Sequence, residues 1–198
     1  ALDRATDRIK ALQSGVTAHL GKPFDPLELV ARCRTLLERK EQQDAVVESA
    51  HLETLHRLAV SAEYRDTDTF AHIQRVGHFC EIIARRLGLS DERVAQLSVA
   101  ARLHDIGKMG IPDTILLKKG RLTGEERAIM QEHTLIGADI LSSSSVPVIR
   151  AAETIALTHH EWWDGGGYPR GLQGEDIPLF GRICAVADVF DALTTVRP

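Results

Sequence analysis

The chain has 198 residues, of which 43% are hydrophobic, 26% charged and 5% aromatic. This length suits one globular domain, or one domain with part of another, and the composition excludes collagenous, low-complexity and largely disordered proteins. The formal net charge of −4 comes from 28 acidic and 24 basic residues without a basic block, so a nucleic-acid duplex is not an expected partner.

Cysteine usage and hydropathy indicate the compartment. The three cysteines, Cys33, Cys80 and Cys184, lie too far apart for a disulfide scaffold or a zinc ribbon, which favours a reducing cytoplasm. No apolar run approaches the ~18–20 residues that span a bilayer, and no signal peptide opens the chain, so membrane insertion is not expected. Because the sequence begins with Ala, we expect a piece of a longer protein.

Residues 1–40 have the pattern helix, strand, loop, helix, with Gly15 as a helix C-cap and Pro26 at a helix start. This segment resembles the last third of a response-regulator receiver domain, in which a Lys-Pro pair like Lys22-Pro23 follows the fifth strand. The resemblance implies an α/β receiver fragment, a phosphoryl contact by Lys22, and a cognate sensor histidine kinase as partner. A purely structural Lys-Pro turn is the alternative.

Residues from Leu27 to about Glu63 lack Pro and Gly and carry apolar side chains at helical spacing. We expect one long connecting helix, with residues 41–62 as the linker between the receiver-like segment and a domain over 63–198. The apolar stripe narrows around residues 38–46, because residues 38–44 are all charged or amidic. This predicts either a homodimer in which a second copy packs along the helix, or a simple exposed linker helix.

The remaining segments are predicted to be helical, so residues 63–198 read as an all-α domain. The expected helices cover residues 69–88, 91–106, 123–141, 146–161 and 179–195. Gly88 and Gly107 are expected at helix ends, Ser90 as an N-cap, and Thr123 with Glu126 as a capping box.

His104 and Asp105 follow an apolar helix. Neighbouring helical residues point about 100° apart, so the pair can share a ligand only where the backbone turns, and we assign that turn to Gly107. Taken alone, such a pair is more often structural than functional.

Further histidines and a carboxylate favour a metal centre. His133, His159, His160 and Asp188 fall in or at the ends of later predicted helices. Imidazole with carboxylate suits divalent iron, manganese, nickel or zinc, whereas calcium and magnesium favour oxygen ligands. Two cations held in this way lower the pKa of a water between them and neutralise charge on a phosphodiester.

Two carboxylates, Asp68 and Asp188, could have purely structural roles instead of binding metal. Asp188 could cap a helix or form an ion pair within a bundle. Asp68 and His72, four residues apart, share one helix face, and either metal ligation or a local ion pair satisfies this spacing.

A run of three glycines, Gly165, Gly166 and Gly167, precedes Tyr168 and Pro169. Glycines let backbone amides approach a ligand closely, and Tyr168 adds an aromatic hydroxyl. The alternative is a flexible turn.

Several separated motifs occur together: His104-Asp105-Ile106-Gly107-Lys108, His159-His160-Glu161, Asp164-Gly165-Gly166-Gly167-Tyr168-Pro169, Ile177-Pro178, and Asp188-Val189-Phe190-Asp191-Ala192-Leu193-Thr194-Thr195 with Arg197-Pro198. In this order, over residues 60–198, they resemble the HD-GYP family of bacterial cyclic di-GMP phosphodiesterases. The resemblance implies an HD-type helical bundle with a central metal site, and hydrolysis of cyclic di-GMP to pGpG or GMP. It also implies GGDEF-type signalling proteins as partners.

The resemblance assigns roles to residues. The implied metal ligands are His72, His104, Asp105, His133, His159, His160 and Asp188, with Asp68 for a third cation. Asp105 and Lys108 would be catalytic, and Lys108, Gly166, Gly167, Tyr168 and Arg197 would bind substrate. We expect two or three divalent cations, iron or manganese, with nickel or zinc as alternatives.

Three departures from the family pattern are visible. Trp162 stands where a basic residue is usual, Phe70 stands where a small residue is common, and the sequence stops at Pro198 before the family's last helices. Two alternative functions remain open: a cyclic di-GMP sensor with weak catalysis that signals through protein contacts, and another HD phosphohydrolase acting on dNTP or ppGpp.

Overall fold

The computed structural model describes residues 23–63 and 70–195. Lys22, Asp68, Arg197 and the helix and strand expected before Lys22 lie outside these residues. The described residues are helices and loops, with one isolated β-bridge between Asp164 and Gln173, which confirms the all-α expectation. The chain divides into two compact units, residues 1–51 and 52–198.

Helix α2 (Pro26–Glu63) confirms the expected long helix. The Asp25 carboxylate accepts a hydrogen bond from the Leu27 N–H at 2.8 Å and so caps its start. In the first unit its side chains are almost all exposed, including Leu37. In the second unit its last turns bury Leu55 and Ala59 in the core.

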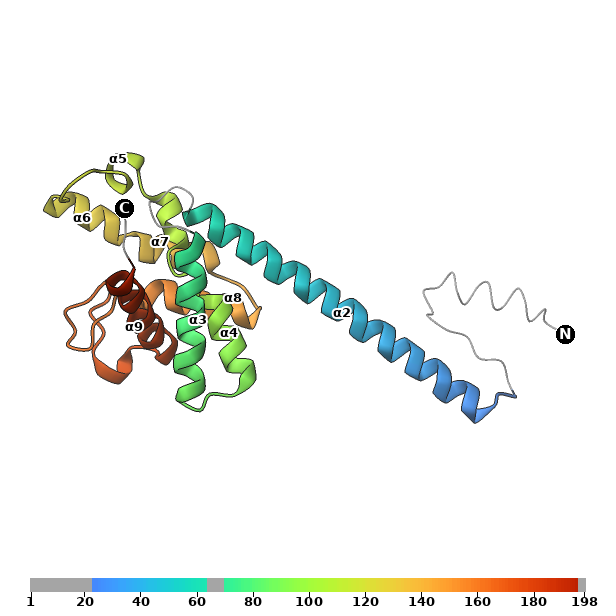
Figure 1. The fold of residues 1–198 in the computed structure, drawn as a ribbon. Coiled ribbons are helices and arrows are strands. Elements are labelled where there is room, and N and C mark those ends of the chain that lie inside the picture. The colour runs from blue at the N-terminus through green and yellow to red at the C-terminus, as the bar shows by residue number, and fades with distance from the viewer. Residues whose placement is uncertain (1–22, 64–69, 196–198) are drawn as a thin grey trace. The chain divides into compact units, whose positions relative to one another are not determined.

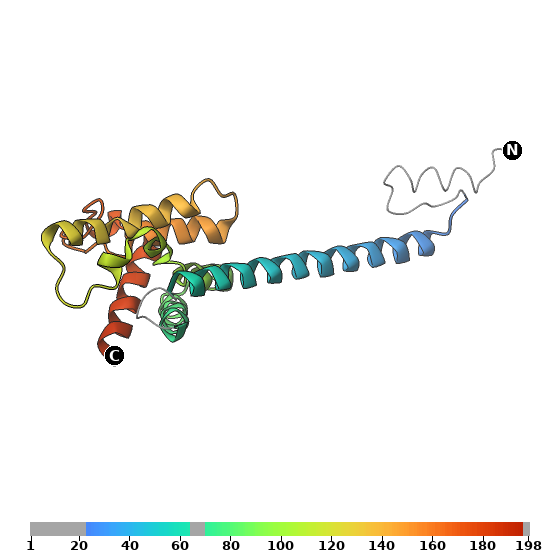
Figure 2. The ribbon, with the colours of Figure 1, turned by 90° about the horizontal axis from the view of Figure 1, so that it is seen from above.

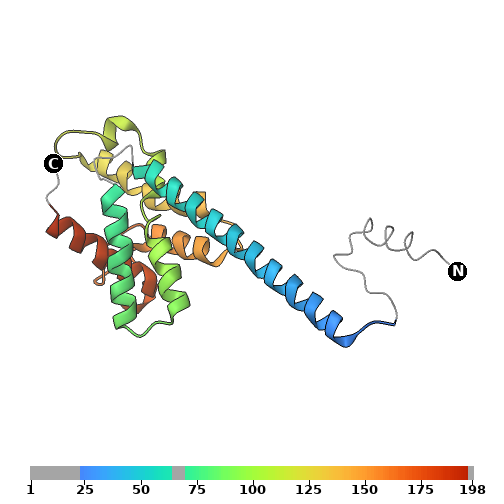
Figure 3. The same ribbon diagram turned by 45° about the vertical axis from the view of Figure 1, so that its right-hand side comes forward.

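The second unit is a bundle of short helices (Figure 1). Its elements are α3 (Phe70–Arg86), α4 (Asp91–Ala101), η1 (Ile106–Gly110), α5 (Asp113–Leu116), α6 (Gly124–Gln131), α7 (His133–Leu141), α8 (Pro147–Thr158), η2 (Gly174–Asp176) and α9 (Leu179–Thr194). Helix α3 packs against α4 and α9, and α8 contacts α4, α7 and α9 (Figures 2 and 3). Of the helices described, none is long and apolar enough to span a membrane.

The core of this unit comes from the apolar faces of α3, α4, α8 and α9. On α3, Ile73, Val76 and Cys80 are fully buried at spacings of three and four residues, which is the pattern of a helix with one face inside. Leu97 of α4 and Ile155 of α8 are buried with them. This core holds α3, α4, α8 and α9 together.

Several expected helix ends are confirmed. Gly88 adopts φ +77 just after α3, the left-handed conformation that glycine favours at a helix C-terminus. The Ser90 side chain caps α4, and Thr123 with Glu126 forms a reciprocal capping box at the start of α6.

Three expected helices were too long. The one expected over 91–106 ends at Ala101, the one over 123–141 breaks at Glu132, and the one over 146–161 ends at Thr158. Beyond Ala101 the backbone tightens to i→i−3 hydrogen bonds, such as Leu103 N–H to Ala100 O at 3.1 Å. Two of these ends leave His104 and His159 at turns, and the break at Glu132 places His133 at the start of α7.

The role expected for Gly107 was wrong. The chain turns before it, over residues 102–105, and Gly107 lies inside η1 without a positive φ. A Cβ at Gly107 would collide with the carbonyl oxygen of His133 and the N–H of Gly137. The glycine is therefore required because η1 packs directly on the backbone of α7.

Candidate metal centre

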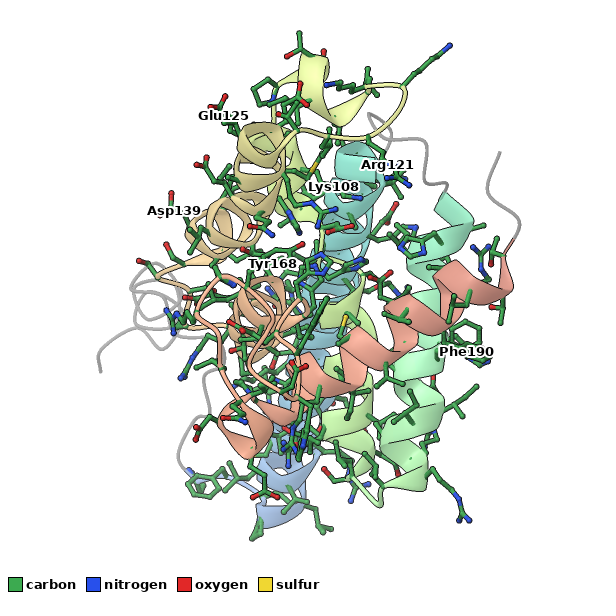
Figure 4. The ribbon with its side chains drawn as sticks, turned by 90° about the vertical axis from the view of Figure 1, so that its left-hand side faces the viewer. Lys108, Arg121, Glu125, Asp139, Tyr168 and Phe190 are labelled. Carbon is green, nitrogen blue, oxygen red and sulfur yellow. The ribbon has the colours of Figure 1, made fainter. Side chains whose placement is uncertain are left out.

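Seven side chains from distant parts of the sequence meet inside the second unit. They are His72 from α3, His104 and Asp105 from the turn after α4, His133 from α7, His159 and His160 from the end of α8, and Asp188 from α9. His104 is fully buried, and only His160 and Asp188 of the seven are partly exposed. Figure 4 shows Lys108 and Tyr168 in this interior region and Phe190 at the outer edge of α9.

The first group of potential ligands contains Asp105, His133, His159 and His160. Their ligand atoms lie within 4.8 Å of one another. Asp105 Oδ1 lies 3.3 Å from His133 Nε2 and 3.4 Å from His159 Nε2. One carboxylate oxygen therefore faces several imidazole nitrogens.

The second group contains His72, His104 and Asp188. His72 Nε2 lies 3.5 Å from Asp188 Oδ1. Asp105 Oδ2 lies 3.3 Å from His104 Nε2, so the two oxygens of Asp105 face different groups. The Asp105 carboxylate therefore lies between the two groups of potential ligands.

Backbone carbonyls orient three of the imidazoles. Nδ1 of His104 lies 2.8 Å from Ala101 O, and Nδ1 of His133 lies 2.7 Å from Met130 O. His159 Nδ1 lies 3.0 Å from Ile155 O. A carbonyl oxygen can only accept, so Nδ1 carries the proton and Nε2 offers its lone pair to the centre.

His72 is oriented by a carboxylate, a relation that sequence reasoning missed. Its Nδ1 lies 2.8 Å from Oδ2 of Asp191, which is 1% exposed. Arg75 donates two hydrogen bonds to the same carboxylate, one of 2.9 Å. Asp191 stands three residues after Asp188 on α9, so one helix supplies both a potential ligand and the partner of another. The recurrence of Asp on one helix was the available signal.

The protonation states suit cation binding. Burial disfavours the charged form of Asp105, but the nearby charge of Lys108 holds the pKa of this carboxyl well below its usual range. Burial lowers the pKa of His159 and lowers the pKa of His160 to about 2. The centre thus presents a carboxylate at Asp105 and neutral imidazoles at His159 and His160, the forms that bind metals.

These residues fit a pair of divalent transition metals. Asp105 Oδ1 is buried and, among the residues described, no hydrogen bond reaches it, although imidazole nitrogens surround it. An unsatisfied buried carboxylate oxygen is costly unless a cation compensates it. The mixture of imidazole and carboxylate selects transition metals over calcium or magnesium.

The loop after α8 folds back onto this centre. Glu161, 3% exposed, accepts hydrogen bonds from the N–H groups of Arg170 at 2.7 Å and Leu172 at 2.9 Å. The Tyr168 N–H donates to His160 O at 3.1 Å. Sequence reasoning placed Glu161 in a motif without giving it a role, because its partners are backbone groups nine and eleven residues away.

Comparison with known proteins identifies the family. A family model described as an HD domain matches residues 32–198. The chain belongs to the HD domain family. This membership, together with the names of its curated relatives, confirms the resemblance drawn from the separated motifs.

Curated relatives of this HD domain are named as phosphodiesterases. The cyclic di-GMP phosphodiesterase response regulator RpfG of Xanthomonas campestris pv. campestris is 47% identical over 96% of this chain and 55% of its own length. A cyclic di-GMP phosphodiesterase of Thermotoga maritima is 53% identical over 74% and 40%, respectively. The 3'3'-cGAMP-specific phosphodiesterase 2 of Vibrio cholerae is 49% identical over 73% and 28%. The chain spans about half or less of these relatives.

A solved structure supports the fold. The crystal structure of a cyclic GMP-AMP specific phosphodiesterase of Vibrio cholerae matches with a TM-score of 0.52 and 23% identity, over 72% of this chain and 40% of that one. At this identity the likeness concerns the fold alone.

The HD domain brings together most of the residues singled out from the sequence. The seven potential ligands, Lys108 and Tyr168 meet at the centre, with Lys108 Nζ 2.7 Å from Asp105 Oδ2. The Gly166 N–H donates to the Asp164 side chain at 2.9 Å. Asp68 and Arg197 lie outside the described residues, so their expected roles remain predictions.

Proposed function

We propose that this HD domain is a metal-dependent phosphodiesterase that hydrolyses cyclic di-GMP to pGpG or GMP. The observation that carries the proposal is the placement of Asp105. Its two carboxylate oxygens face two separate groups of potential ligands, and Oδ2 also forms an ion pair with Lys108. The names of the relatives at 47% and 53% identity support the substrate class.

The two ligand groups would each hold one divalent cation, iron or manganese, with nickel or zinc as alternatives. Asp68 would contribute to a third cation. Cations bound there would activate a water and neutralise charge on the phosphodiester. The donor set supports a transition metal without selecting among these elements, because affinity order alone does not determine cellular loading.

The protein's own side chains would bind and orient the phosphodiester. Lys108 Nζ, 13% exposed as a side chain and beside Asp105, is placed to bind a non-bridging phosphate oxygen and to stabilise charge on the leaving group. Burial raises the pKa of Tyr168, so its hydroxyl stays protonated and can donate to substrate. Arg197 would add a bidentate phosphate contact, and Gly166 and Gly167 would let the loop approach the ligand.

Three alternatives make different predictions. A sensor would bind cyclic di-GMP without turnover, but the pairing of Lys108 with Asp105 favours catalysis. A dNTP or ppGpp hydrolase would ignore cyclic dinucleotides. A preference for 3'3'-cGAMP is suggested by the name of the relative at 49% identity, so this dinucleotide belongs in the assay.

We also propose a signalling context. A receiver-like segment over residues 1–40 would couple a sensor histidine kinase to the domain at 63–198 through a helical linker at 41–62, in the cytoplasm. The exposed side chains along α2 support packing against a second copy, with an exposed linker as the alternative. GGDEF-type proteins are further proposed partners. Equal turnover by the phosphorylated and unphosphorylated full-length protein would contradict this coupling.

The test is anaerobic incubation of the protein with cyclic di-GMP and, in parallel, 3'3'-cGAMP, ppGpp and a dNTP. Separate samples are loaded with Fe(II), Mn(II) or Ni(II), and products are separated by chromatography. We expect pGpG or GMP with at least one metal, and no product from Asp105→Ala. Intact cyclic di-GMP under all conditions, with binding seen by calorimetry, would favour the sensor.

A further inference from the structure

His160 differs from the other imidazoles of the metal centre. His72, His104, His133 and His159 each engage Nδ1 in a hydrogen bond to a carboxylate or carbonyl oxygen. In the described part of the chain, no hydrogen bond reaches the His160 ring. A ligating histidine is normally oriented through its second nitrogen, so another contact has to set the direction of this ring.

Tyr168 makes that contact. The two rings stack with centroids 4.7 Å apart and an interplanar angle of 23°. His159 and His133 also approach His160, at 4.1 Å and 5.1 Å, but both are themselves potential ligands. Because the Tyr168 N–H also binds His160 O, the tyrosine fixes both the ring and the backbone of this histidine.

The loop is constructed to bring Tyr168 to this place. A Cβ at Gly167 would collide with His160 O and with the Trp162 N–H, so only glycine permits the close return of the loop. After Tyr168, the loop is held by the Glu161 carboxylate, which accepts hydrogen bonds from the N–H groups of Arg170 and Leu172. The position of the Tyr168 ring is thus set by the loop, without any need for its hydroxyl.

We propose that Tyr168 is a positioning residue: its stacked ring orients His160 toward Asp105 and so strengthens cation binding by the group of Asp105, His133, His159 and His160. This inference rests on the proposed metal centre and concerns the ring alone. It is separate from any contact between the tyrosine hydroxyl and substrate.

The test is calorimetric titration of the metal-stripped protein with Mn(II), with bound metal counted by mass spectrometry. We expect Tyr168→Phe to bind Mn(II) with wild-type affinity. Tyr168→Leu should weaken one of the two binding events by ~10-fold, which is the smallest loss of affinity usual when a residue that orients a metal ligand is removed. Trp162→Leu, on the same loop and 59% exposed, serves as the matched control and should match the wild type. Wild-type affinity in Tyr168→Leu, or equal losses in Tyr168→Phe and Tyr168→Leu, would overturn the proposal.

A double-mutant cycle with His160→Ala assigns the effect to the stacked pair. In the His160→Ala background, Tyr168→Leu should cause no further loss of Mn(II) affinity. A further loss there would place the action of Tyr168 elsewhere and reject the inference. Circular dichroism checks that each variant folds. Tyr168→Met, which fills similar volume without a ring, replaces Tyr168→Leu with the same expectation if the latter unfolds.

The same titration separates the two proposals. A wild-type protein that binds no Mn(II), Fe(II) or Ni(II) would reject the metal centre itself. A wild-type protein that binds two cations, beside a Tyr168→Leu variant of equal affinity, would reject only the positioning role.

Discussion

His72 Nδ1 lies 2.8 Å from Oδ2 of Asp191, and the two residues are 119 positions apart in the sequence. The contact links α3 to α9 inside the bundle and leaves His72 Nε2 facing Asp188. Arg75, one turn after His72, donates hydrogen bonds to both oxygens of the same carboxylate. The orientation of the His72 ring and the packing of α3 on α9 therefore depend on one buried side chain, that of Asp191.

This relation predicts the effect of Asp191→Asn. The amide keeps the shape but loses the charge that favours a proton on His72 Nδ1, and we expect Mn(II) affinity at the His72, His104 and Asp188 group to fall ~10-fold or more. Titration calorimetry measures the change. Asp139→Asn on α7, an exposed carboxylate labelled in Figure 4, is the control that should have no effect. Unchanged affinity in Asp191→Asn would show that His72 needs no orienting charge.

A second prediction concerns Gly107→Ala. The added methyl would collide with the His133 carbonyl oxygen, which belongs to backbone and cannot rotate away. We expect the free energy of unfolding to fall by ~2–3 kcal/mol or more, as for overpacked sites, and the centre to lose metal affinity because His133 shifts. Urea denaturation measures the first effect.

Gly124→Ala provides the matched control for Gly107→Ala. Gly124 begins α6, and a Cβ there meets no atom within 4 Å. Its replacement should leave stability unchanged or slightly raised, because alanine reduces the freedom of the unfolded chain. Equal losses in the two variants would contradict a steric role for Gly107.

Whether a contact of the site can be predicted from the sequence depends on how far apart its residues lie along the chain. Helix periodicity, caps at Ser90 and Thr123, and the motif spacing predict the all-α fold and the residues that meet at the centre. The Arg75 and Asp191 pair could not be predicted, because it joins residues 116 positions apart through packing of α3 on α9. Gly107 was misjudged for the same reason, since its neighbour is the backbone of another helix.

Acid pH should weaken the capping box of α6. Hydrogen bonds from Lys118 and from the Thr123 N–H lower the pKa of Glu126 below its ordinary value of 4.5. A carboxyl whose folded pKa is depressed stabilises the fold above its unfolded pKa, and that contribution is lost as pH falls through the folded pKa. We therefore expect Glu126→Gln to lower the thermal midpoint at pH 7 and to differ less from the wild type near pH 3.5.

The control for this titration is Glu125→Gln, the neighbouring exposed carboxylate in the first turn of α6. Among the described residues, Thr123 and Lys118 bond to Glu126 and not to Glu125, so the effect of Glu125→Gln should be smaller at pH 7. A midpoint difference for Glu126→Gln that stays constant across this pH range would show that the charge of Glu126 does not stabilise the cap.

Glu161→Gln tests how the loop is held over the centre. Both Glu161 oxygens accept backbone N–H groups, and glutamine replaces one acceptor with an NH₂ that faces a donor. We expect a loss of ~1–3 kcal/mol of stability, because a buried hydrogen-bonding group is left unsatisfied. Amide hydrogen exchange at Arg170 and Leu172 should accelerate.

Loosening of this loop in Glu161→Gln should also affect the candidate metal centre, because the loop carries Tyr168, whose ring stacks on His160. Mn(II) affinity in Glu161→Gln is therefore expected to fall in the same direction as in Tyr168→Leu. Glu175→Gln in η2, which is exposed, is the control and should leave exchange and affinity at wild-type values. Faster exchange at Arg170 and Leu172 with unchanged affinity would mean that His160 keeps its orientation when the anchor is lost, because the stacking and the Tyr168 N–H bond suffice.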